Sequence, residues 1–395
     1  MQLKSLPEAE LKGKKVIVRF DFNVPLTKTE PRTITDSSRI DQAIPTIKFL
    51  LEKGASKIIM ISHLGRPDGQ VNPKYSLEPV AEYLAKTLGQ DVILSESAID
   101  NGVKNLLQLP ETKLVLLENI RFLPGEEKND MELAEKLASY GDIYVNDAFG
   151  AAHRKHASTY AINAFFKNRA YAGLLMNKEI DSLGALMDKP AKPFVAVLGG
   201  AKVSDKIKTI ERMMVMVDSL LIGGAMAYPF LKAKGISIGK SLCSDEDVAL
   251  AKQLLQQDKG GKIQLPKDHI VASGLEGQAQ VCEGTSIPAD MMGLDIGPQT
   301  IRAFGDHIKT AKTIFWNGPM GLFESKAFAK GTMEVAKLIA NTKAFTVVGG
   351  GDSVAAANES GEADKFSHVS TGGGASLEFI EKGELPGVQA LKYGV

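Results

Sequence analysis

Polar and basic side chains follow the apolar segments in the first half of the chain. The residues in these positions are Asp21, Asn23, His63, Arg66, Arg121 and Arg154. Arginine offers planar, bidentate hydrogen bonding to phosphate and carboxylate, and each charge-assisted bond contributes about 1.5–3 kcal/mol. A single arginine is better explained by a salt bridge to a neighbouring carboxylate. Several at successive strand ends predict a site for a small, strongly anionic molecule, because such ends converge on one crevice.

Three residues around this predicted anion site carry additional information. Asp21 and Asn23 alternate with phenylalanines, so their side chains share one face and suit recognition of hydroxyl groups. Arg39 opens a helical pattern, where a cation is unfavourable for the helix dipole unless it faces an anion. Arg19 directly follows a strand that is apolar on both faces. We expect it at the strand end or in a pair, because an unpaired buried charge is very costly.

Glycine-rich turns follow the apolar segments in the second half. They are GGAKVSDK (199–206), GGGDS (349–353) and TGGGA (371–375). Glycine lets the backbone approach phosphate closely, and the free N–H groups of a following helix attract anions. Lys202 and Lys206 would lie at the start of the first such helix. A single turn of this kind is equally explained by tight strand–helix packing, and no Walker A motif is present. Three turns with two lysines predict a nucleotide phosphate site.

Two carboxylates near these turns each have two interpretations. Asp352 suits a helix N-cap, and it also suits a Mg²⁺ ligand, since hard cations prefer carboxylates alongside phosphates. Glu324 could accept hydrogen bonds from ribose hydroxyls or be a solvated loop residue. The spacing alone leaves both alternatives open.

The elements that must position these residues alternate between strands and helices. The apolar runs are short and rich in Val, Ile and Leu, as in buried parallel strands. The helical patterns between them include 38–54, 76–89, 130–141, 244–257 and 325–342. Such alternation predicts an α/β protein with doubly wound parallel sheets. The chemistry of the strand ends changes at 176–193, a helical pattern followed by a proline-rich connector, and we place a domain junction there.

Composition narrows the functional class. The chain has 395 residues, 44% of them hydrophobic, and a formal net charge of zero. Zero net charge argues against bulk electrostatic binding to nucleic acid or membrane. The two cysteines are too few for a disulfide framework. The first residues lack the apolar core of a secretory signal, so the cytoplasm is the expected compartment.

Together these segments resemble the phosphoglycerate kinase family along essentially the whole chain. The matching motifs are KVIVRFDFNVP (15–25), HLGRP (63–67), ENIRFLPGEEKND (118–130), VNDAFGAAHRKHAS (145–158), GGAKVSDKI (199–207), MGLDIGP (292–298), WNGPMGLFE (316–324), GGGDS (349–353) and STGGGASLE (370–378). The resemblance implies a Mg²⁺-dependent, reversible transfer between 1,3-bisphosphoglycerate and ADP that gives 3-phosphoglycerate and ATP, a step of glycolysis and gluconeogenesis.

The resemblance also implies roles for residues. Those implied to bind the acid substrate are Asp21, Asn23, Arg39, His63, Arg66, Arg121 and Arg154. Those implied to bind the nucleotide are Gly200, Ala201, Lys202, Lys206, Gly224, Leu294, Asn317, Pro319, Glu324, Gly350, Gly351, Asp352 and Ser353, with Leu294 and Pro319 on the adenine side and Asp352 on the metal.

The same resemblance implies an organisation. It implies a monomer of two Rossmann-like domains, 1–175 for phosphoglycerate and 194–375 for nucleotide, joined by a hinge at 176–193. The segment 376–395 would pack back on the N-terminal domain. The implied catalytic residues are Arg39, Lys202, Gly350 and Gly373. Arg39 and Lys202 are expected to meet the transferring phosphoryl group from opposite sides, while the two glycine-rich turns offer N–H groups to it.

Two positions depart from the family pattern. Ser353 stands where many members have threonine, and the hydroxyl is retained. Pro229 also stands where threonine is expected, but proline is tolerated in a first helical turn.

Two other functions are weaker alternatives. A nicotinamide dehydrogenase would need G-x-G-x-x-G after a strand, and no predicted strand here is followed by it. A non-catalytic, hinged small-anion binding protein would typically carry an export signal. An assay with ATP, Mg²⁺ and 3-phosphoglycerate separates these alternatives.

Overall fold

The computed structural model describes residues 3–395, which divide into two units. Unit 1 comprises the described residues up to Asp181 together with Glu384–Val395, and unit 2 comprises Ser182–Gly383. The boundary falls within helix α5 (Leu174–Met187), inside the segment that sequence analysis assigns to the hinge.

Unit 1 is built on a sheet of six parallel strands. The strands are β1 (Lys15–Arg19), β2 (Lys57–Ile61), β3 (Val92–Leu94), β4 (Leu114–Leu116), β5 (Ile143–Asn146) and β6 (Ala170–Ala172), in the order β3-β4-β2-β1-β5-β6. From β1 the chain passes to β2 on one side and later to β5 on the other, so the strand order reverses between β1 and β5. Ligands of such sheets bind where the order reverses, beyond the carboxyl ends of the strands.

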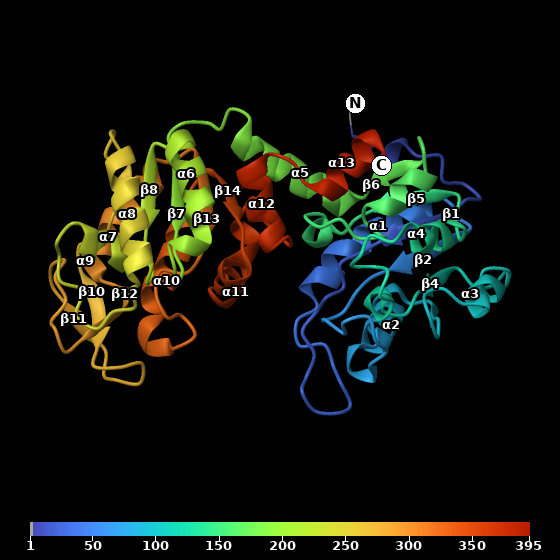
Figure 1. Ribbon diagram of the computed structural model, residues 1–395, viewed down its shortest axis with the longest axis horizontal. Coiled ribbons are helices and arrows are strands. Elements are labelled where there is room, and N and C mark those ends of the chain that lie inside the picture. The colour runs from blue at the N-terminus through green and yellow to red at the C-terminus, as the bar shows by residue number, and fades with distance from the viewer. Residues whose placement is uncertain (1–2) are drawn as a thin grey trace. The chain divides into compact units, whose positions relative to one another are not determined.

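Helices cover this sheet, and their apolar faces supply much of the core. Unit 1 contains α1 (Ser38–Glu52), α2 (Glu78–Leu88), α3 (Asn101–Leu106), α4 (Met131–Ala138) and α13 (Pro386–Tyr393). In α1, residues Ile40, Ile44, Ile47 and Leu50 are buried at helical spacing. Helix α13 contacts β6, and Figure 1 shows it in red beside that strand.

The returning C-terminal segment is shorter than the expected 376–395. Helix α12 (Gly374–Lys382) packs against α6 (Ile207–Met216), and the hydroxyl of Thr209 donates to Glu381 at 2.6 Å. These contacts place α12 in unit 2, and the segment grouped with unit 1 begins at Glu384.

Unit 2 contains a second sheet of six parallel strands. They are β7 (Phe194–Leu198), β8 (Ser219–Ile222), β9 (Ile263–Gln264), β13 (Thr313–Asn317), β14 (Phe345–Val348) and β15 (His368–Val369), in the order β15-β14-β13-β7-β8-β9. The chain runs outward from β7 to β9 and then returns to β13 on the other side of β7. This is the doubly wound order of nucleotide-binding sheets, and its reversal point lies between β7 and β13.

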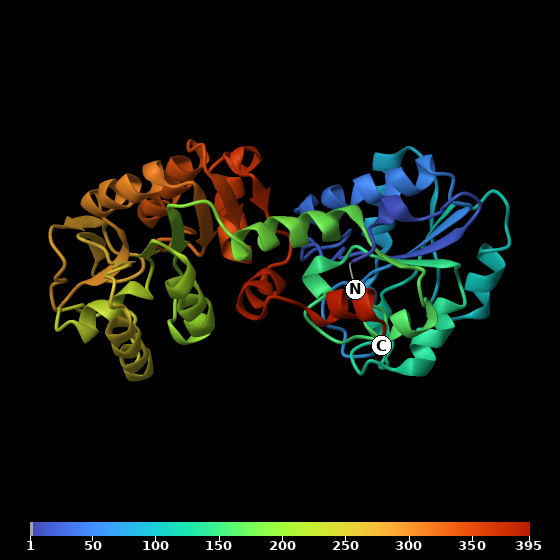
Figure 2. The same cartoon turned by 90° about the horizontal axis from the view of Figure 1, so that it is seen from above.

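Helices lie on both sides of this second sheet. Those not yet named are α7 (Ala227–Ala233), α8 (Asp245–Gln257), α9 (Pro298–Thr310), α10 (Lys330–Ala340) and α11 (Gly351–Glu359). Figure 2 shows α9 and α10, in orange, on one side of the strands and α6 and α8, in green to yellow, on the other. Pro229 lies in the first turn of α7, where proline is tolerated. The expected class of two parallel-sheet α/β domains is therefore confirmed.

Unit 2 also contains a small antiparallel sheet that the sequence analysis does not predict. Its strands are β10 (His269–Ala272), β11 (Gln280–Cys282) and β12 (Met292–Ile296), in the order β11-β10-β12. Strand β11 has only three residues, and two of them are exposed, so it lacks the apolar run that marks the parallel strands. Strand β12 contains Leu294, one of the expected adenine-pocket residues.

Candidate active site

A polar cluster in unit 1 forms around Asp21, which follows β1. Arg39, in the first turn of α1, donates from Nη1 to Oδ2 of Asp21 at 3.0 Å. The Nε2 atom of His63, which follows β2, lies 4.0 Å from Oδ1 of Asp21. Burial would raise the pKa of Asp21, but the positive charges of Arg39 and Arg19 outweigh it and hold the pKa below its usual value. The cluster therefore presents an ionised carboxylate beside cationic and hydrogen-bonding groups.

Asn23 and Arg121 are both tied to the turn after β2. The N–H of Gly65 donates to Oδ1 of Asn23 at 2.9 Å, and Nη1 of Arg121 donates to the carbonyl oxygen of Gly65 at 2.8 Å. Arg121 also lies 3.3 Å from Glu127. Burial, followed by the charge of Arg19, lowers the pKa of the Arg121 guanidinium. These contacts gather residues that follow β1, β2 and β4 into one site.

Arg154 and Arg66 lie at the edge of this group. Arg154 is exposed and donates from Nε to Nε2 of His153 at 3.1 Å, and its charge contributes to lowering the pKa of Arg121. Arg66 is exposed, and in residues 3–395 no hydrogen bond or ion pair joins it to the cluster. To bind the acid substrate as expected, the side chains of Arg66 and Arg154 would have to contact the ligand directly.

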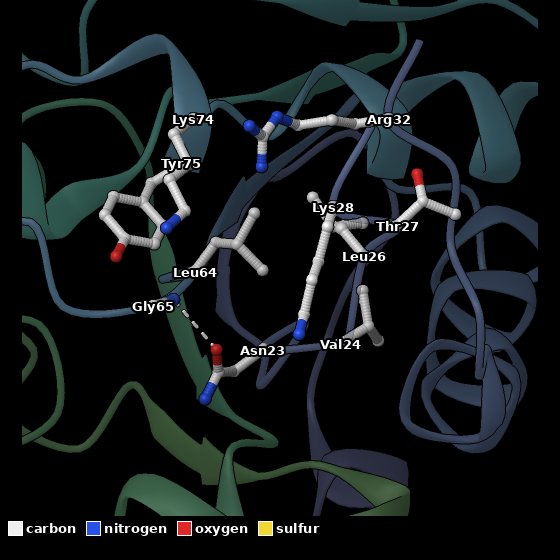
Figure 3. A pocket seen from close by; sticks show the side chains of 10 residues that line it. All are labelled: Asn23, Val24, Leu26, Thr27, Lys28, Arg32, Leu64, Gly65, Lys74 and Tyr75. Atoms are coloured by element: carbon white, nitrogen blue, oxygen red, sulfur yellow. Dashed lines mark hydrogen bonds between the residues drawn. The ribbon is translucent and has the colours of Figure 1, made fainter. Parts of the chain in front are cut away.

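A pocket of about 430 Å³ adjoins the polar cluster at Asn23 and Gly65. Figure 3 shows Lys28, Arg32 and Lys74 around it, with the hydrogen bond between Asn23 and Gly65 drawn as a dashed line. Its remaining lining residues are Val24, Leu26, Thr27, Leu64 and Tyr75. Arg32 is paired with the exposed Glu30 at 2.6 Å. The pocket therefore extends the positive field beside the site, which favours the approach of an anion.

Two of the glycine-rich turns of unit 2, 199–206 and 349–353, are joined through Lys206 and Asn317. The Nζ atom of Lys206 donates to the carbonyl oxygen of Gly199 at 2.6 Å and to that of Asn317 at 3.3 Å. Asn317 in turn donates from Nδ2 to the carbonyl oxygen of Gly349 at 2.6 Å. The turns after β7, β13 and β14 are thereby joined at the reversal point of the sheet.

Gly350 and Ser353 shape the start of α11. Gly350 has a φ of +91°, and a Cβ there would lie 2.4 Å from Nδ2 of Asn317, so only glycine fits. The hydroxyl of Ser353 accepts a hydrogen bond from the N–H of Gly318. The hydroxyl that is common to serine and threonine is thus used in the structure.

Burial lowers the pKa of Lys206 to about 8, and the charge of Asp352 opposes this effect. An ammonium group is destabilised when it is removed from water without a charged partner. A bound phosphate group would supply that partner, so the site favours an anionic ligand.

A cavity of about 440 Å³ opens beside these turns. Of the expected nucleotide residues, seven line it: Gly200, Ala201, Gly224, Leu294, Pro319, Glu324 and Asp352. The other lining residues were not predicted from the sequence, among them Tyr228, Leu242, Leu275, Met292 and Leu322. Leu242 and Leu275 are 57% and 61% exposed. The one sequence signal that could have marked them is a leucine set among polar residues and glycines, in KSLCS (240–244) and SGLEG (273–277). The cavity combines apolar lining residues with a glycine-rich turn.

Other expected residues lie outside the lining of this cavity. Lys206 is hydrogen-bonded to the carbonyl oxygens of Gly199 and Asn317, and Ser353 is buried in the turn. Lys202 and Gly351 are exposed. Gly373, with a φ of +51°, stands at the start of α12. Their predicted contacts with phosphate remain predictions.

Comparisons with known proteins agree along the whole chain. The family model described as phosphoglycerate kinase matches residues 6–383. The phosphoglycerate kinase of Anaeromyxobacter sp. (strain Fw109-5) is 51% identical over 99% of this chain and 100% of that protein. The cytosolic phosphoglycerate kinase of Triticum aestivum is 50% identical over 98% of this chain and 97% of its own length.

Solved structures lead to the same conclusion. The phosphoglycerate kinase of Coxiella burnetii superposes with a TM-score of 0.89 at 40% identity, covering 99% of both chains. That of Pyrococcus horikoshii OT3 gives a TM-score of 0.84 at 32% identity, covering 99% of this chain and 98% of its own. The chain with these two sites therefore belongs to the phosphoglycerate kinase family of phosphotransferases.

Proposed function

We propose that this chain transfers a phosphoryl group reversibly between 1,3-bisphosphoglycerate and ADP, with Mg²⁺, to give 3-phosphoglycerate and ATP. The observation that carries the proposal is the combination of two sites in one chain of this family. One is the cationic cluster around Asp21 in unit 1, and the other is the cavity beside Lys206 in unit 2. The alternative of a non-catalytic anion-binding protein finds no support, because the relatives named above are enzymes.

The acid substrate is assigned to the unit 1 cluster. The residues proposed to bind it are Asp21, Asn23, Arg39, His63, Arg66, Arg121 and Arg154. The arginines would bind its carboxylate and phosphate oxygens with charge-assisted hydrogen bonds. The ionised carboxylate of Asp21 would accept a hydrogen bond from the substrate hydroxyl. These roles agree with the several cationic donors of the site and with the lowered pKa of Asp21, which keeps its carboxylate ionised.

The nucleotide is assigned to unit 2. The apolar walls near Leu294 and Pro319 would receive adenine, and Glu324 would accept hydrogen bonds from ribose hydroxyls. The phosphates would lie at the glycine-rich turns, close to Lys202 and Lys206. The remaining residues proposed for this site are Gly200, Ala201, Gly224, Asn317, Gly350, Gly351, Asp352 and Ser353.

The residues at the phosphate end of the cavity fit a bound Mg²⁺ ion. Asp352 is exposed and lines the cavity, and its negative charge acts to raise the pKa of Lys206. Among the described residues, no group of three or more His, Cys, Asp or Glu side chains could hold a metal ion. Mg²⁺ is commonly held by one or two carboxylates together with substrate phosphates. Asp352 would thus hold the ion jointly with the nucleotide, and the ion would neutralise phosphate charge.

Phosphoryl transfer to a carboxylate needs positioning and charge stabilisation more than proton transfer. The acceptor carboxylate is ionised at neutral pH, so no general base is required. Arg39 and Lys202 would stabilise the charge of the transferring group, and the N–H groups near Gly350 and Gly373 would donate hydrogen bonds to it.

The reaction requires a conformational step, which we assign to residues 176–193. An acyl phosphate hydrolyses in water, so the reacting groups must meet where water is excluded. The boundary between the two units falls inside this segment, at Asp181 and Ser182.

We further propose a cytoplasmic monomer. A relative at 50% identity is named as cytosolic, and no helix within residues 3–395 is long and apolar enough to cross a membrane. Light scattering coupled to size-exclusion chromatography would test the oligomeric state.

A coupled assay tests the reaction itself. The full chain is given ATP, Mg²⁺ and 3-phosphoglycerate, and acyl phosphate formation is followed by the oxidation of NADH in a reductive second step. Activity should require all three components, and EDTA should abolish it. Absence of turnover in a folded preparation, or equal rates without 3-phosphoglycerate, would overturn the proposal.

A further inference from the structure

Arg19 is fully buried and contacts His63 of the polar cluster around Asp21. Its Nε atom donates to the hydroxyl of Ser158 at 2.7 Å, and one Nη atom donates to the carbonyl oxygen of Phe20. The other Nη atom lies 3.2 Å from Nδ1 of His63. The expectation that this charge is paired is met by Glu126, whose carboxylate lies 3.8 Å from Arg19.

The contact with Arg19 decides where His63 carries its proton. A guanidinium group has only donors, so Nδ1 of His63 must be the acceptor in this hydrogen bond. A neutral imidazole that accepts at Nδ1 carries its hydrogen on Nε2. A doubly protonated ring would place an N–H against the N–H of Arg19, which is repulsive.

The charges that face His63 also favour the neutral ring. Burial lowers the pKa of His63, the carboxylate of Asp21 opposes this, and Arg19, Arg121 and Arg39 lower it further. The net result is a pKa well below the usual value. His63 is thus neutral at physiological pH, and its Nε2–H is on the side where Asp21 lies 4.0 Å away, too far for a hydrogen bond.

We propose that Arg19 is a positioning residue that holds His63 as a neutral ring with its proton on Nε2, so that Nε2 donates a hydrogen bond to an acceptor oxygen of the acid substrate. The assignment of that oxygen rests on the proposed function. The assignment of the proton rests only on the contacts within unit 1.

Other residues hold Arg19 in this orientation. The hydroxyl of Ser158 accepts from Arg19 and donates to Oε1 of Glu126 at 2.6 Å, and the N–H of Ser158 donates to Oε2 at 2.9 Å. The hydroxyl of Tyr144 donates to the carbonyl oxygen of Ser158 at 2.7 Å. His156 also lies 3.8 Å from Glu126, but burial, followed by the charge of Arg19, lowers its pKa to about 3. Glu126 is therefore committed to Arg19 and Ser158.

The first test reads the proton position directly in the ligand-free full chain. Histidine labelled with ¹⁵N and long-range ¹H–¹⁵N correlation spectra distinguish the two neutral forms and the charged form. The His63→Gln variant identifies the His63 signals. We expect protonated Nε2, unprotonated Nδ1 and no titration between roughly pH 6 and pH 8. A ring protonated on Nδ1, or a midpoint within that range, would overturn the proposal.

The second test removes Arg19 without leaving a buried charge behind. Arg19→Met is combined with Glu126→Gln, because a lone buried carboxylate would strongly destabilise unit 1. We expect the proton of His63 to be shared between Nδ1 and Nε2 in this double variant. The KM for 3-phosphoglycerate should rise about tenfold, because one well-oriented hydrogen bond is lost. The KM for MgATP should not change.

Arg169→Met provides the matched control. This arginine belongs to the same unit, and within residues 3–395 its side chain donates to the backbone oxygens of Asp142 and Phe165, so the KM for 3-phosphoglycerate should not change. An unchanged His63 ring in the double variant, or an altered ring with an unchanged KM, would show that Arg19 has only a structural role. If the double variant does not fold, the wild-type spectra still decide the proton position. If the wild type lacks turnover, the proposed function fails, whereas the Arg19–His63 result stands.

Discussion

The Nζ atom of Lys206 donates to the carbonyl oxygen of Gly199 at 2.6 Å, across the turn that joins β7 to the next helix. In this position the ammonium group is largely buried, and burial lowers its pKa to about 8. The pKa of the Lys206 ammonium group is thus close to neutral pH, and the group lies next to the cavity assigned to the nucleotide. A phosphate that binds here would restore the charged form by raising this pKa.

Nucleotide binding should therefore be coupled to proton uptake. Because the pKa of Lys206 is about 8, a substantial share of the ligand-free molecules lacks this proton at pH 8, and bound ATP should restore it. Calorimetric titration with ATP in buffers of different ionisation enthalpy should show net uptake at pH 8 that vanishes near pH 6, where Lys206 is already charged. In Lys206→Met the uptake at pH 8 should be lost. Equal uptake in the variant would assign the proton to another group.

Gly199→Ala should disrupt the nucleotide site through the backbone. A Cβ at this position would lie 1.9 Å from the carbonyl oxygen of Pro319, a residue that lines the cavity. The segment at Pro319 must therefore move, with a loss of stability of about 1–3 kcal/mol. We expect the KM for ATP to rise and the KM for 3-phosphoglycerate to be kept. Gly260→Ala is the matched control, because its nearest neighbour would lie 3.7 Å away.

Local sequence patterns predicted the parallel strands and glycine-rich turns because both depend on neighbouring residues. The antiparallel sheet of β10, β11 and β12 was missed because pairing between distant, partly exposed segments leaves no periodic signal. Leu242 and Leu275 were missed for a related reason, since only the tertiary fold brings them to Leu294. The cost of burying Arg19 was predictable from one strand, whereas its partners, Ser158 and Glu126, required the structure.

Leu275→Ala should weaken nucleotide binding with little effect on folding. The side chain is 61% exposed and lines the cavity, so it has little packing to lose in the ligand-free protein. Adenine that covered it would bury part of a leucine side chain, worth about 1 kcal/mol, which corresponds to a roughly fivefold rise in the KM for ATP. Val281→Ala is the control, because Val281 is 57% exposed in the same unit and does not line this cavity. Equal effects of the two variants on the KM would contradict the assignment of adenine to this cavity.

Asp147→Asn should alter how stability depends on pH. Asp147 is buried and accepts from the N–H of Met176 at 2.9 Å, in the first turn of α5. Burial raises its pKa to about 6 from 3.8, so the folded state binds more protons than the unfolded state between these values. This contribution to stability is present at low pH and declines as the pH rises to about 6. Melting midpoints of the wild type relative to Asp147→Asn should fall across this range, whereas the exposed Asp91→Asn should follow the wild type.

Arg39→Ala should strongly reduce turnover while nucleotide binding is retained. Arg39 is the largest charge acting to lower the pKa of Asp21, to which it donates at 3.0 Å, and it is proposed to stabilise the transferring phosphoryl group. Loss of one preorganised donor of this kind costs about 10²–10³ in kcat. Because Arg39 belongs to unit 1 and the nucleotide is assigned to unit 2, the Kd for ATP measured by calorimetry should change little. Arg169→Ala removes an exposed arginine from the same unit, and its kcat should match the wild type. A wild-type kcat in Arg39→Ala would overturn the catalytic role of this residue. A large loss of ATP affinity would contradict the assignment of the nucleotide to unit 2 alone.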